Sequence, residues 1–352
     1  MQKDRQNPRP PIRSTAALAA HLGLSRWTVS RVLNGHPGIK QETRERVEKA
    51  MIRLRFAPSP MARALRGGRT GTVGICLQEL EGFNLAAKIS ALQARLRPAG
   101  FRGLLELSDG QPQVETEILH HFAAMQVEGV VIFSGTLSPK SPSFRALREA
   151  GIPVVFIDPR SPLYPGSVWV DRGAAIGQVT RHLLKLGHRH FAALGINPDS
   201  YYGAVRGRAL QESLAPPHAP RETRLLSLFE PDAERMDFEY GQRLTELLLA
   251  GRKRPTALIA LNDRIAFGVM ETLKRRGHDI PRDFSIVGYD NSDLGAFATP
   301  ALTTVDPHVD LLIDHAVRLL VESIAKKGEG RSASHRIEPE LILRYSTAAA
   351  RY

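Results

Sequence analysis

The chain has 352 residues, 42% of them hydrophobic, which is enough to bury sizeable cores in two or three domains and excludes a disordered chain. Its one cysteine, Cys76, excludes an intramolecular disulfide and favours a reducing compartment. The net charge of +12 lies mostly in residues 1–70, which hold 15 Lys/Arg and 4 Asp/Glu, whereas the remainder holds 33 and 32. This basic block attracts a polyanion by counterion release. Nucleic acid suits it better than a membrane surface, because the block lacks an apolar anchoring face.

The amino-terminal segment does not have the pattern of a targeting signal. Residues 1–13 are basic, contain prolines and lack an apolar run, so we expect no signal peptide. No stretch approaches the length needed to span a bilayer, so we expect no membrane partner. With the lone cysteine, these features predict a cytoplasmic protein, which would be associated with the nucleoid if its partner is DNA.

The first predicted elements are two short helices joined by a turn at Gly23, where φ is free to be positive. Leu18 and Leu22 belong to an apolar stripe on the first helix, which Ser14 or Thr15 could cap. A stripe this narrow needs neighbouring helices to bury it, so the two helices should belong to one small helical unit.

The second helix begins at Ser25, a good N-cap, and its two faces differ in chemistry. One face is apolar and can bury against the neighbouring helices; it holds Val29, Val32 and Leu33. The other face is polar or aromatic at i, i+3, i+4 and i+7; it holds Trp27, Ser30, Arg31 and Asn34, with Arg26 beside them. Helix, glycine turn and polar-faced helix form the helix-turn-helix arrangement, whose second helix enters the DNA major groove. The alternative is an amphipathic hairpin with a solvated face.

A third helix is predicted from Gln41 to Leu54, because apolar residues repeat there at helical spacing. Three short helices around one core make a DNA-reading headpiece, for which we predict the bounds 13–57. Prolines then open a short, weak helix, and Gly67–Gly71 behaves as a linker, so residues 58–71 are predicted as hinge helix and linker.

From Thr72 the pattern changes to alternating strands and helices. We predict strands at Thr72–Leu77, Gly103–Leu107, Gly129–Phe133, Val154–Ile157, Phe191–Leu194, Arg224–Phe229, Ala257–Leu261 and Ser285–Tyr289. We predict helices at Leu85–Leu96, Glu115–Met125, Ser143–Ala150, Gly173–Leu186, Val205–Leu214, Tyr240–Leu249, Ile265–Arg276 and Asp310–Ala325. One further element follows at Arg336–Leu343. Strands separated by helices indicate parallel sheets covered on both faces. Two successive runs predict two doubly wound subdomains, and in such sheets ligands bind beyond the carboxyl ends of the strands.

Ordered motifs make the chain resemble the LacI/GalR family of bacterial transcription regulators over about residues 14–347. In the headpiece these are Leu24-Ser25, Thr28 to Gly35, Thr43-Arg44-Glu45 with Val47, and the 58–65 hinge. In the body they are Gly187 to His190, Asn262-Asp263, Pro281 to Asp290, Leu302 to Val305, and Glu338 to Leu341 with Arg344 and Ser346-Thr347. One helix-turn-helix is a weak signal, but this ordered series is specific.

The resemblance implies a periplasmic-binding-protein-like body at 72–347, with an N-subdomain at about 72–169 and 305–333 and a C-subdomain at about 170–304 and 334–347. It also implies a small-molecule effector in the cleft between the subdomains, and a homodimer that binds a near-palindromic operator in double-stranded DNA. The chain ends at Tyr352 without a leucine-heptad tail, so we expect a dimer rather than a tetramer.

Nine residues are the predicted DNA contacts. Arg31 can donate two parallel hydrogen bonds to guanine O6 and N7, and Trp27 could pack on a thymine methyl or simply shield the helix start. Leu65 matches the family leucine that wedges into the minor groove, although it could instead pack on the headpiece. The full set is Ser25, Arg26, Trp27, Thr28, Ser30, Arg31, Asn34, Leu65 and Arg66.

The predicted effector contacts follow predicted strands or match family positions. Asn262 and Asp290 match hydrogen-bonding positions of the family, and Asp158 lies just past a strand; each could instead be a capped loop residue. Tyr202 stands where sugar-responsive relatives often have arginine, although Arg206 is near, so a sugar-like effector is a default expectation. The full set is Gln78, Phe83, Ser134, Asp158, Tyr202, Arg206, Met236, Asn262 and Asp290.

Enzymatic function is not supported by any motif. The chain lacks a Gly-x-Ser-x-Gly elbow and a phosphate loop, and its histidine pairs lack metal-site spacing, so we predict no catalysis, metal or cofactor. Two alternatives to an effector-controlled repressor stay open. One is a DNA-binding regulator with a ligand-independent body, and the other is a solute-binding protein without a DNA role.

Overall fold

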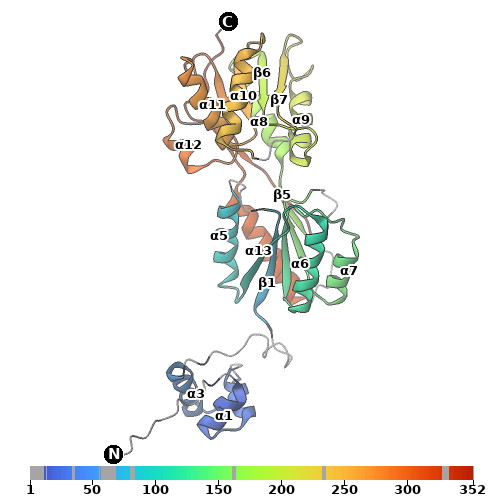
Figure 1. Ribbon diagram of the computed structural model, residues 1–352, viewed down its shortest axis with the longest axis vertical. Coiled ribbons are helices and arrows are strands. Elements are labelled where there is room, and N and C mark those ends of the chain that lie inside the picture. The colour runs from blue at the N-terminus through green and yellow to red at the C-terminus, as the bar shows by residue number, and fades with distance from the viewer. Residues whose placement is uncertain are drawn as a thin grey trace, which may run out of the picture. The chain divides into compact units, whose positions relative to one another are not determined.

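The computed structural model describes residues 12, 14–33, 36–54, 56, 69–79, 84–160, 164–231, 235–326 and 333–351. The chain divides into two compact units, Met1–Gly71 and Thr72–Tyr352 (Figure 1). The predicted hinge helix, with Leu65 and Arg66, lies outside the described residues, as do Asn34 and Phe83. In the described part of the chain, no helix is long and apolar enough to cross a membrane.

The described residues of the first unit form three helices, α1 (Thr15–Leu22), α2 (Arg26–Leu33) and α3 (Gln41–Arg53). Ser14 caps α1 by accepting a hydrogen bond from the Ala17 amide at 3.1 Å. Gly23 ends α1 in the left-handed region, with φ at 62°, which turns the chain into α2. One apolar cluster holds the three helices together; it includes Leu18, Leu22, Val29, Val32, Val47 and Ala50.

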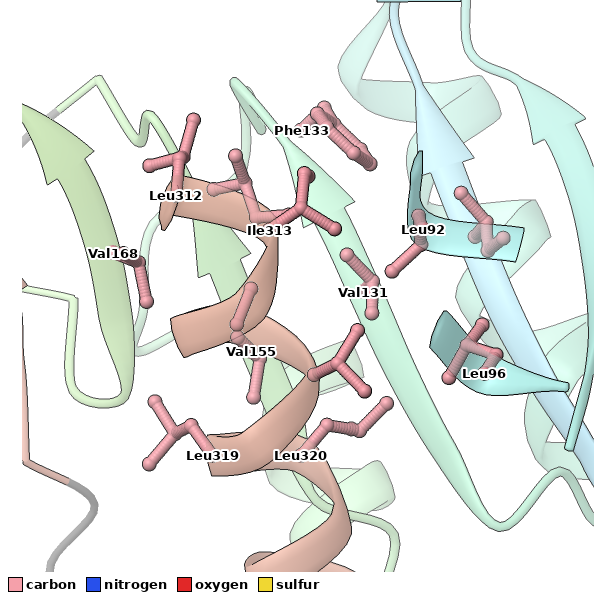
Figure 2. Close-up of a cluster of buried hydrophobic side chains, with 14 of the residues drawn as sticks. Leu92, Leu96, Val131, Phe133, Val155, Val168, Leu312, Ile313, Leu319 and Leu320 are labelled. Atoms are coloured by element: carbon pink, nitrogen blue, oxygen red, sulfur yellow. The ribbon is translucent and has the colours of Figure 1, made fainter. Parts of the chain in front are cut away.

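The second unit begins with a six-stranded parallel sheet of order β11-β5-β4-β3-β1-β2. Its strands are β1 (Thr72–Leu77), β2 (Arg102–Leu107), β3 (Gly129–Phe133), β4 (Val154–Ile157), β5 (Ser167–Val170) and β11 (His335–Ile337). Its helices are α5 (Leu85–Leu96), α6 (Pro112–Ala124), α7 (Pro142–Glu149) and α13 (Val309–Ala325). Helices α5 and α13 pack on one face, where Leu92, Leu312 and Leu320 meet Val131 and Val155 (Figure 2), while α6 and α7 cover the other.

A second parallel sheet, of order β7-β6-β8-β9, forms the other subdomain. Its strands are β6 (His190–Leu194), β7 (Arg224–Leu228), β8 (Ala257–Ala260) and β9 (Ser285–Val287). Helices α8 (Arg172–Lys185) and α9 (Tyr201–Ser213) share one core with the sheet, and α10 (Phe238–Ala250) and α11 (Asp263–Arg275) share the other (Figure 1). A short helix α12 (Asp293–Phe297) follows β9, and β10 (Thr304–Asp306) pairs antiparallel with β12 (Glu340–Ile342).

The structure corrects the predicted elements in several places. Strand β5, strand β10 and helix α12 were not predicted, because three to five residues carry too little periodicity. Helix α9 begins at Tyr201, four residues earlier than predicted, because Ser200 caps it. The segment predicted as one element at Arg336–Leu343 is two strands, which Pro339 separates because it has no amide hydrogen for a ladder. Strand β11 pairs with β5, so His335–Ile337 belongs to the sheet of the N-subdomain.

Candidate DNA-reading face and ligand cleft

The start of α2 is held by a local hydroxyl pair. Ser25 Oγ accepts from the Thr28 amide at 3.0 Å and lies 2.9 Å from Thr28 Oγ1, so the two predicted contacts form the helix cap. Val29 and Val32 are buried, which fixes the opposite face outward. Trp27 is 64% exposed on that outward face, and Arg26 is also exposed.

Arg31 is confined by its neighbours. Its guanidinium carbon lies 4.5 Å from the centroid of the Trp27 ring, and its Nη2 lies 3.0 Å from Nδ1 of His36. Arg44 on α3 donates to the carbonyl of His36 at 2.9 Å, which ties the loop after α2 to the third helix. The sequence contained the Trp27–Arg31 spacing of one helical turn, but nothing in it predicted the contribution of His36.

In the N-subdomain, three predicted effector residues follow three adjacent strands. Gln78 follows β1, Ser134 follows β3 and Asp158 follows β4. The side-chain amide of Gln78 donates a hydrogen bond to the Ser134 carbonyl, and the Ser134 hydroxyl donates one to the Asp158 carbonyl at 3.3 Å. Ser134 and Asp158 have φ values of 52° and 49°, in the left-handed region. This conformation is uncommon for residues other than glycine.

Asp158 is an internal ion-pair centre. It is 2% exposed, and its carboxylate lies 2.7 Å from Lys88 Nζ and 3.1 Å from Arg172 Nη2. The Val170 amide donates to the same carboxylate at 3.1 Å. Burial by itself would raise the pKa of Asp158, but the charges of Arg172 and Lys88 outweigh burial and hold that pKa well below its ordinary value. Sequence reasoning did not predict that Lys88 and Arg172 pair with Asp158.

In the C-subdomain, Asn262 is a helix cap. Its Oδ1 accepts from the Ile265 amide at 2.8 Å, and its Nδ2 donates to the Met236 carbonyl at 3.0 Å. Its amide group therefore connects the start of α11 to the segment before α10. This is the capping role that sequence analysis kept as an alternative, and the effector role of Asn262 and Met236 stays a prediction.

Asp290 follows β9 with φ at 108°, a conformation rare for a side chain of this size. Burial, and next the charge of Asp263, raise the pKa of Asp290 to about 7 against the opposing charges of Arg206, Lys88 and Arg172. Asn84, immediately before α5 in the other subdomain, donates to the Asp290 carbonyl at 3.2 Å. Asp290 is thus connected directly to both subdomains.

Arg206 on α9 is 7% exposed, and its guanidinium carbon lies 4.4 Å from the centroid of the Tyr289 ring. Among the described residues, neither the buried Nε of Arg206 nor the buried hydroxyl of Tyr289 has a hydrogen-bond partner. Burial lowers the pKa of Arg206 and raises that of Tyr289. The charges of Arg206 and Arg172 act to lower the pKa of Tyr289, whereas those of Asp290 and Asp158 act to raise it.

A pocket of about 740 Å³ adjoins this cleft, between α5, α12 and the start of α13. Asp290 is the predicted effector residue that lines it, together with Asn84, Asn291 and His308. Tyr202 lies in the first turn of α9, and its side chain is outside the described part of the structure. Most of the polar residues described above follow strands β1, β3, β4 and β9 or lie on α5, α8 and α9.

A three-helix unit with a polar recognition face and a two-subdomain body with a polar cleft define a DNA-binding protein that carries a ligand-binding module. Residues 16–59 match the family model for bacterial regulatory proteins of the lacI family, and residues 180–347 match the model for a periplasmic binding protein-like domain. The chain is similar to the HTH-type transcriptional regulator MalR of Streptomyces coelicolor, at 31% identity over 95% of this chain and 96% of the relative. It is 30% identical to the HTH-type transcriptional regulator DegA of Bacillus subtilis, over 94% of this chain and 97% of the relative.

Two solved structures are similar over nearly the whole chain. The lac repressor dimer bound to operator and the anti-inducer ONPF matches with a TM-score of 0.83 and 24% identity, covering 96% of this chain and 99% of that chain. The complex of the transcriptional regulator CelR with cellobiose matches with a TM-score of 0.65 and 26% identity, covering 95% and 99%.

The chain therefore belongs to the lacI family of bacterial regulatory proteins, and it is a DNA-binding transcriptional regulator with a periplasmic-binding-protein-like domain. The resemblance and the fold class that the sequence predicted are confirmed. The interpretation as a solute-binding protein without a DNA role is excluded.

Proposed function

We propose that the chain is a repressor whose affinity for its operator is controlled by a small polar effector bound between the two subdomains. The observation that carries this proposal is the pair Arg206 and Tyr289, whose buried Nε and hydroxyl have no protein partner among the described residues. Unpaired buried polar groups are unfavourable, so they favour a bound molecule that supplies the partners.

The chemistry of the cleft suits a molecule rich in hydroxyl groups. Hydroxyl oxygens accept hydrogen bonds from the Arg206 guanidinium, and hydroxyl hydrogens can be donated to Asp290. The similar CelR structure is described as a cellobiose complex. We therefore propose a sugar-like effector, contacted by the cleft members of the predicted set: Gln78, Phe83, Ser134, Asp158, Tyr202, Arg206, Met236, Asn262 and Asp290.

Control of DNA affinity requires that the effector bias the relative position of the subdomains. Asn84 from the N-subdomain bonds the Asp290 carbonyl, and Arg172 at the start of α8 pairs with Asp158 of the N-subdomain. An effector that contacts Asp290 and Arg206 changes the balance of these connections. A coupling of about 1–3 kcal/mol would be typical of such regulation.

The proposed DNA contacts are the outward residues of α2 together with three residues outside the described part of the structure. The α2 set is Ser25, Arg26, Trp27, Thr28, Ser30 and Arg31, and the others are Asn34, Leu65 and Arg66. Arg31 and Arg26 carry the charge of this face, and the basic residues 1–70 supply a sequence-independent attraction. We also propose that the protein works in the cytoplasm at the nucleoid and has no catalytic role.

Exposed apolar side chains on the body support a homodimer. Phe297 on α12 is 85% exposed, and Tyr345, in the segment after β12, is 77% exposed. These two regions adjoin each other, because a Cβ placed on Gly295 would lie 3.2 Å from Nη1 of Arg344. Leu294 and Leu343 are exposed beside them. Large exposed apolar side chains gathered in one place favour a protein partner, and a second copy suits a regulator that reads a near-palindrome.

The test is a thermal-shift screen of neutral sugars and related polyols, followed by operator titration with the best compound. The operator is first obtained by selection from random duplexes. We expect a compound that raises the melting temperature and changes operator affinity, and we expect Asp290→Ala to lose both responses while keeping unliganded operator affinity. Asp199→Ala, an exposed carboxylate in the same subdomain, is the matched control. Binding without any change in operator affinity would instead support the ligand-independent body.

A further inference from the structure

The guanidinium of Arg31 is presented in one particular orientation. Among the described residues, its buried Nε has no hydrogen-bond partner, and its Nη2 donates to Nδ1 of His36 at 3.0 Å. Nε and Nη2 together form the side edge of the guanidinium, so the side edge faces the protein. The end edge, with one N–H from each Nη atom, is the pair of donors left for guanine O6 and N7.

Two neighbours restrict the Arg31 guanidinium to this orientation. The first is the Trp27 ring, whose centroid lies 4.5 Å from the guanidinium carbon. The second is the loop after α2, where a Cβ placed on Gly38 would lie 3.1 Å from Arg31 Nη2. Arg44 holds this loop by donating to the His36 carbonyl at 2.9 Å. An aromatic face beside a guanidinium attracts the cation and leaves its in-plane donors accessible.

We propose that Trp27 is a positioning residue for Arg31, so that the two side chains read one base pair as a unit and Trp27 selects no base of its own. This inference rests on the proposed DNA-reading function of α2. An unrestrained arginine loses much rotamer freedom when it docks on a base, and the Trp27 ring removes part of that loss in advance. The exposure of Trp27 then follows from its place over an arginine that must itself face the groove.

The competing role for Trp27 is direct contact with a thymine methyl. The two roles predict different base pairs. If Trp27 positions Arg31, removal of the ring weakens the guanine preference that Arg31 creates. If Trp27 contacts thymine, its removal relaxes a neighbouring base pair and leaves the guanine preference unchanged.

The experiment uses the full-length protein. Selection from random duplexes at fixed salt defines the half-site, and competition titrations then compare all four base pairs at each position. The proteins are the wild type, Trp27→Ala, Trp27→Phe, Arg31→Ala and the double variant Trp27→Ala/Arg31→Ala. Ile52→Ala is the matched control, because Ile52 is 80% exposed on α3 of the same unit.

We expect Arg31→Ala to lose about tenfold in preference at one base pair. Trp27→Ala should lose about two- to fivefold at that same base pair, and Trp27→Phe, which keeps an aromatic face, should lose less. The double variant should be no worse there than Arg31→Ala alone, since residues that act as one unit are not additive. Ile52→Ala should leave all preferences unchanged.

Two results would overturn the inference while leaving the proposed function intact. The first is a Trp27→Ala protein that relaxes a different base pair, and the second is a double variant whose losses multiply. If the wild type itself selects no sequence, the proposed function is wrong and the inference falls with it.

Discussion

Replacing Asp290 with asparagine should make the stability of the body less dependent on pH. In the native protein, burial and the charge of Asp263 raise the pKa of Asp290 from 3.8 to about 7. Folding therefore favours the protonated Asp290 carboxyl. The contribution of this protonation to the free energy of unfolding is fully present below about pH 3.8 and is lost as the pH rises through about 7. Asparagine has a similar size and cannot ionise, so Asp290→Asn removes this loss.

The expected size follows from the raised pKa. Between pH 5 and pH 7 the folded protein holds a proton that the unfolded chain has released, and each unit of pH corresponds to about 1.4 kcal/mol. The free energy of unfolding of Asp290→Asn relative to wild type should therefore rise by roughly 2–3 kcal/mol between pH 5 and pH 8. Relaxation around Arg206 and Lys88 would reduce this value.

Urea unfolding at pH 5 and pH 8 measures the difference. Fluorescence of Trp169 on β5 reports on the body if Trp27 is replaced by phenylalanine in every protein compared. Asp199→Asn, which removes an exposed carboxylate of the same subdomain, should show no such pH dependence. A stability difference between Asp290→Asn and its parent that is equal at both pH values would refute the reasoning.

Three further predictions concern the ligand, assembly and operator binding. Arg206→Met should raise the stability of the free body by about 1–2 kcal/mol, because it removes a buried guanidinium whose Nε has no hydrogen-bond partner among the described residues, and it should abolish the thermal shift by effector. Arg208→Met, at an exposed position on α9, should do neither, and a destabilised Arg206→Met would contradict us. Phe297→Glu should convert dimers into monomers in light scattering at micromolar concentration, since it places a charge on the exposed apolar patch; an unchanged dimer would exclude this surface. Leu65→Ala should weaken operator binding while calorimetry finds effector affinity unchanged, and loss of both in a folded protein would show that the two functions are not separate.

Local sequence patterns were sufficient for elements whose own residues determine them. The predicted bounds of α5, β1, β3 and β4 coincide with the structure, because each has a full helical stripe or an unbroken apolar run. The helix-turn-helix arrangement was likewise readable from residues within one or two turns of each other. Ordered motifs then identified the family, which no single element could do.

Contacts between distant segments decided the rest. Strands β5 and β10 are too short to be recognised alone. Strand β5 pairs with β4 and β11, and β10 pairs with β12, so each is completed by a strand from the end of the chain. Distant segments also supply the partners of side chains in the cleft. Asp158 obtains its ion pair from Lys88, 70 residues away, and Arg206 is buried against Tyr289 by the packing of α9 and β9 on one sheet.

The sequence by itself therefore determined the kind of protein, the order of its elements and most of the candidate positions. It could not determine which candidates already have partners within the chain. Asn262 caps a helix, Asp158 is neutralised by two cations, and the Nε of Arg206 has no partner among the residues that the structure describes. The physical reason is that helical and strand periodicity are properties of neighbouring residues. The burial, pKa and hydrogen bonding of a side chain depend on the residues that the tertiary fold brings against it.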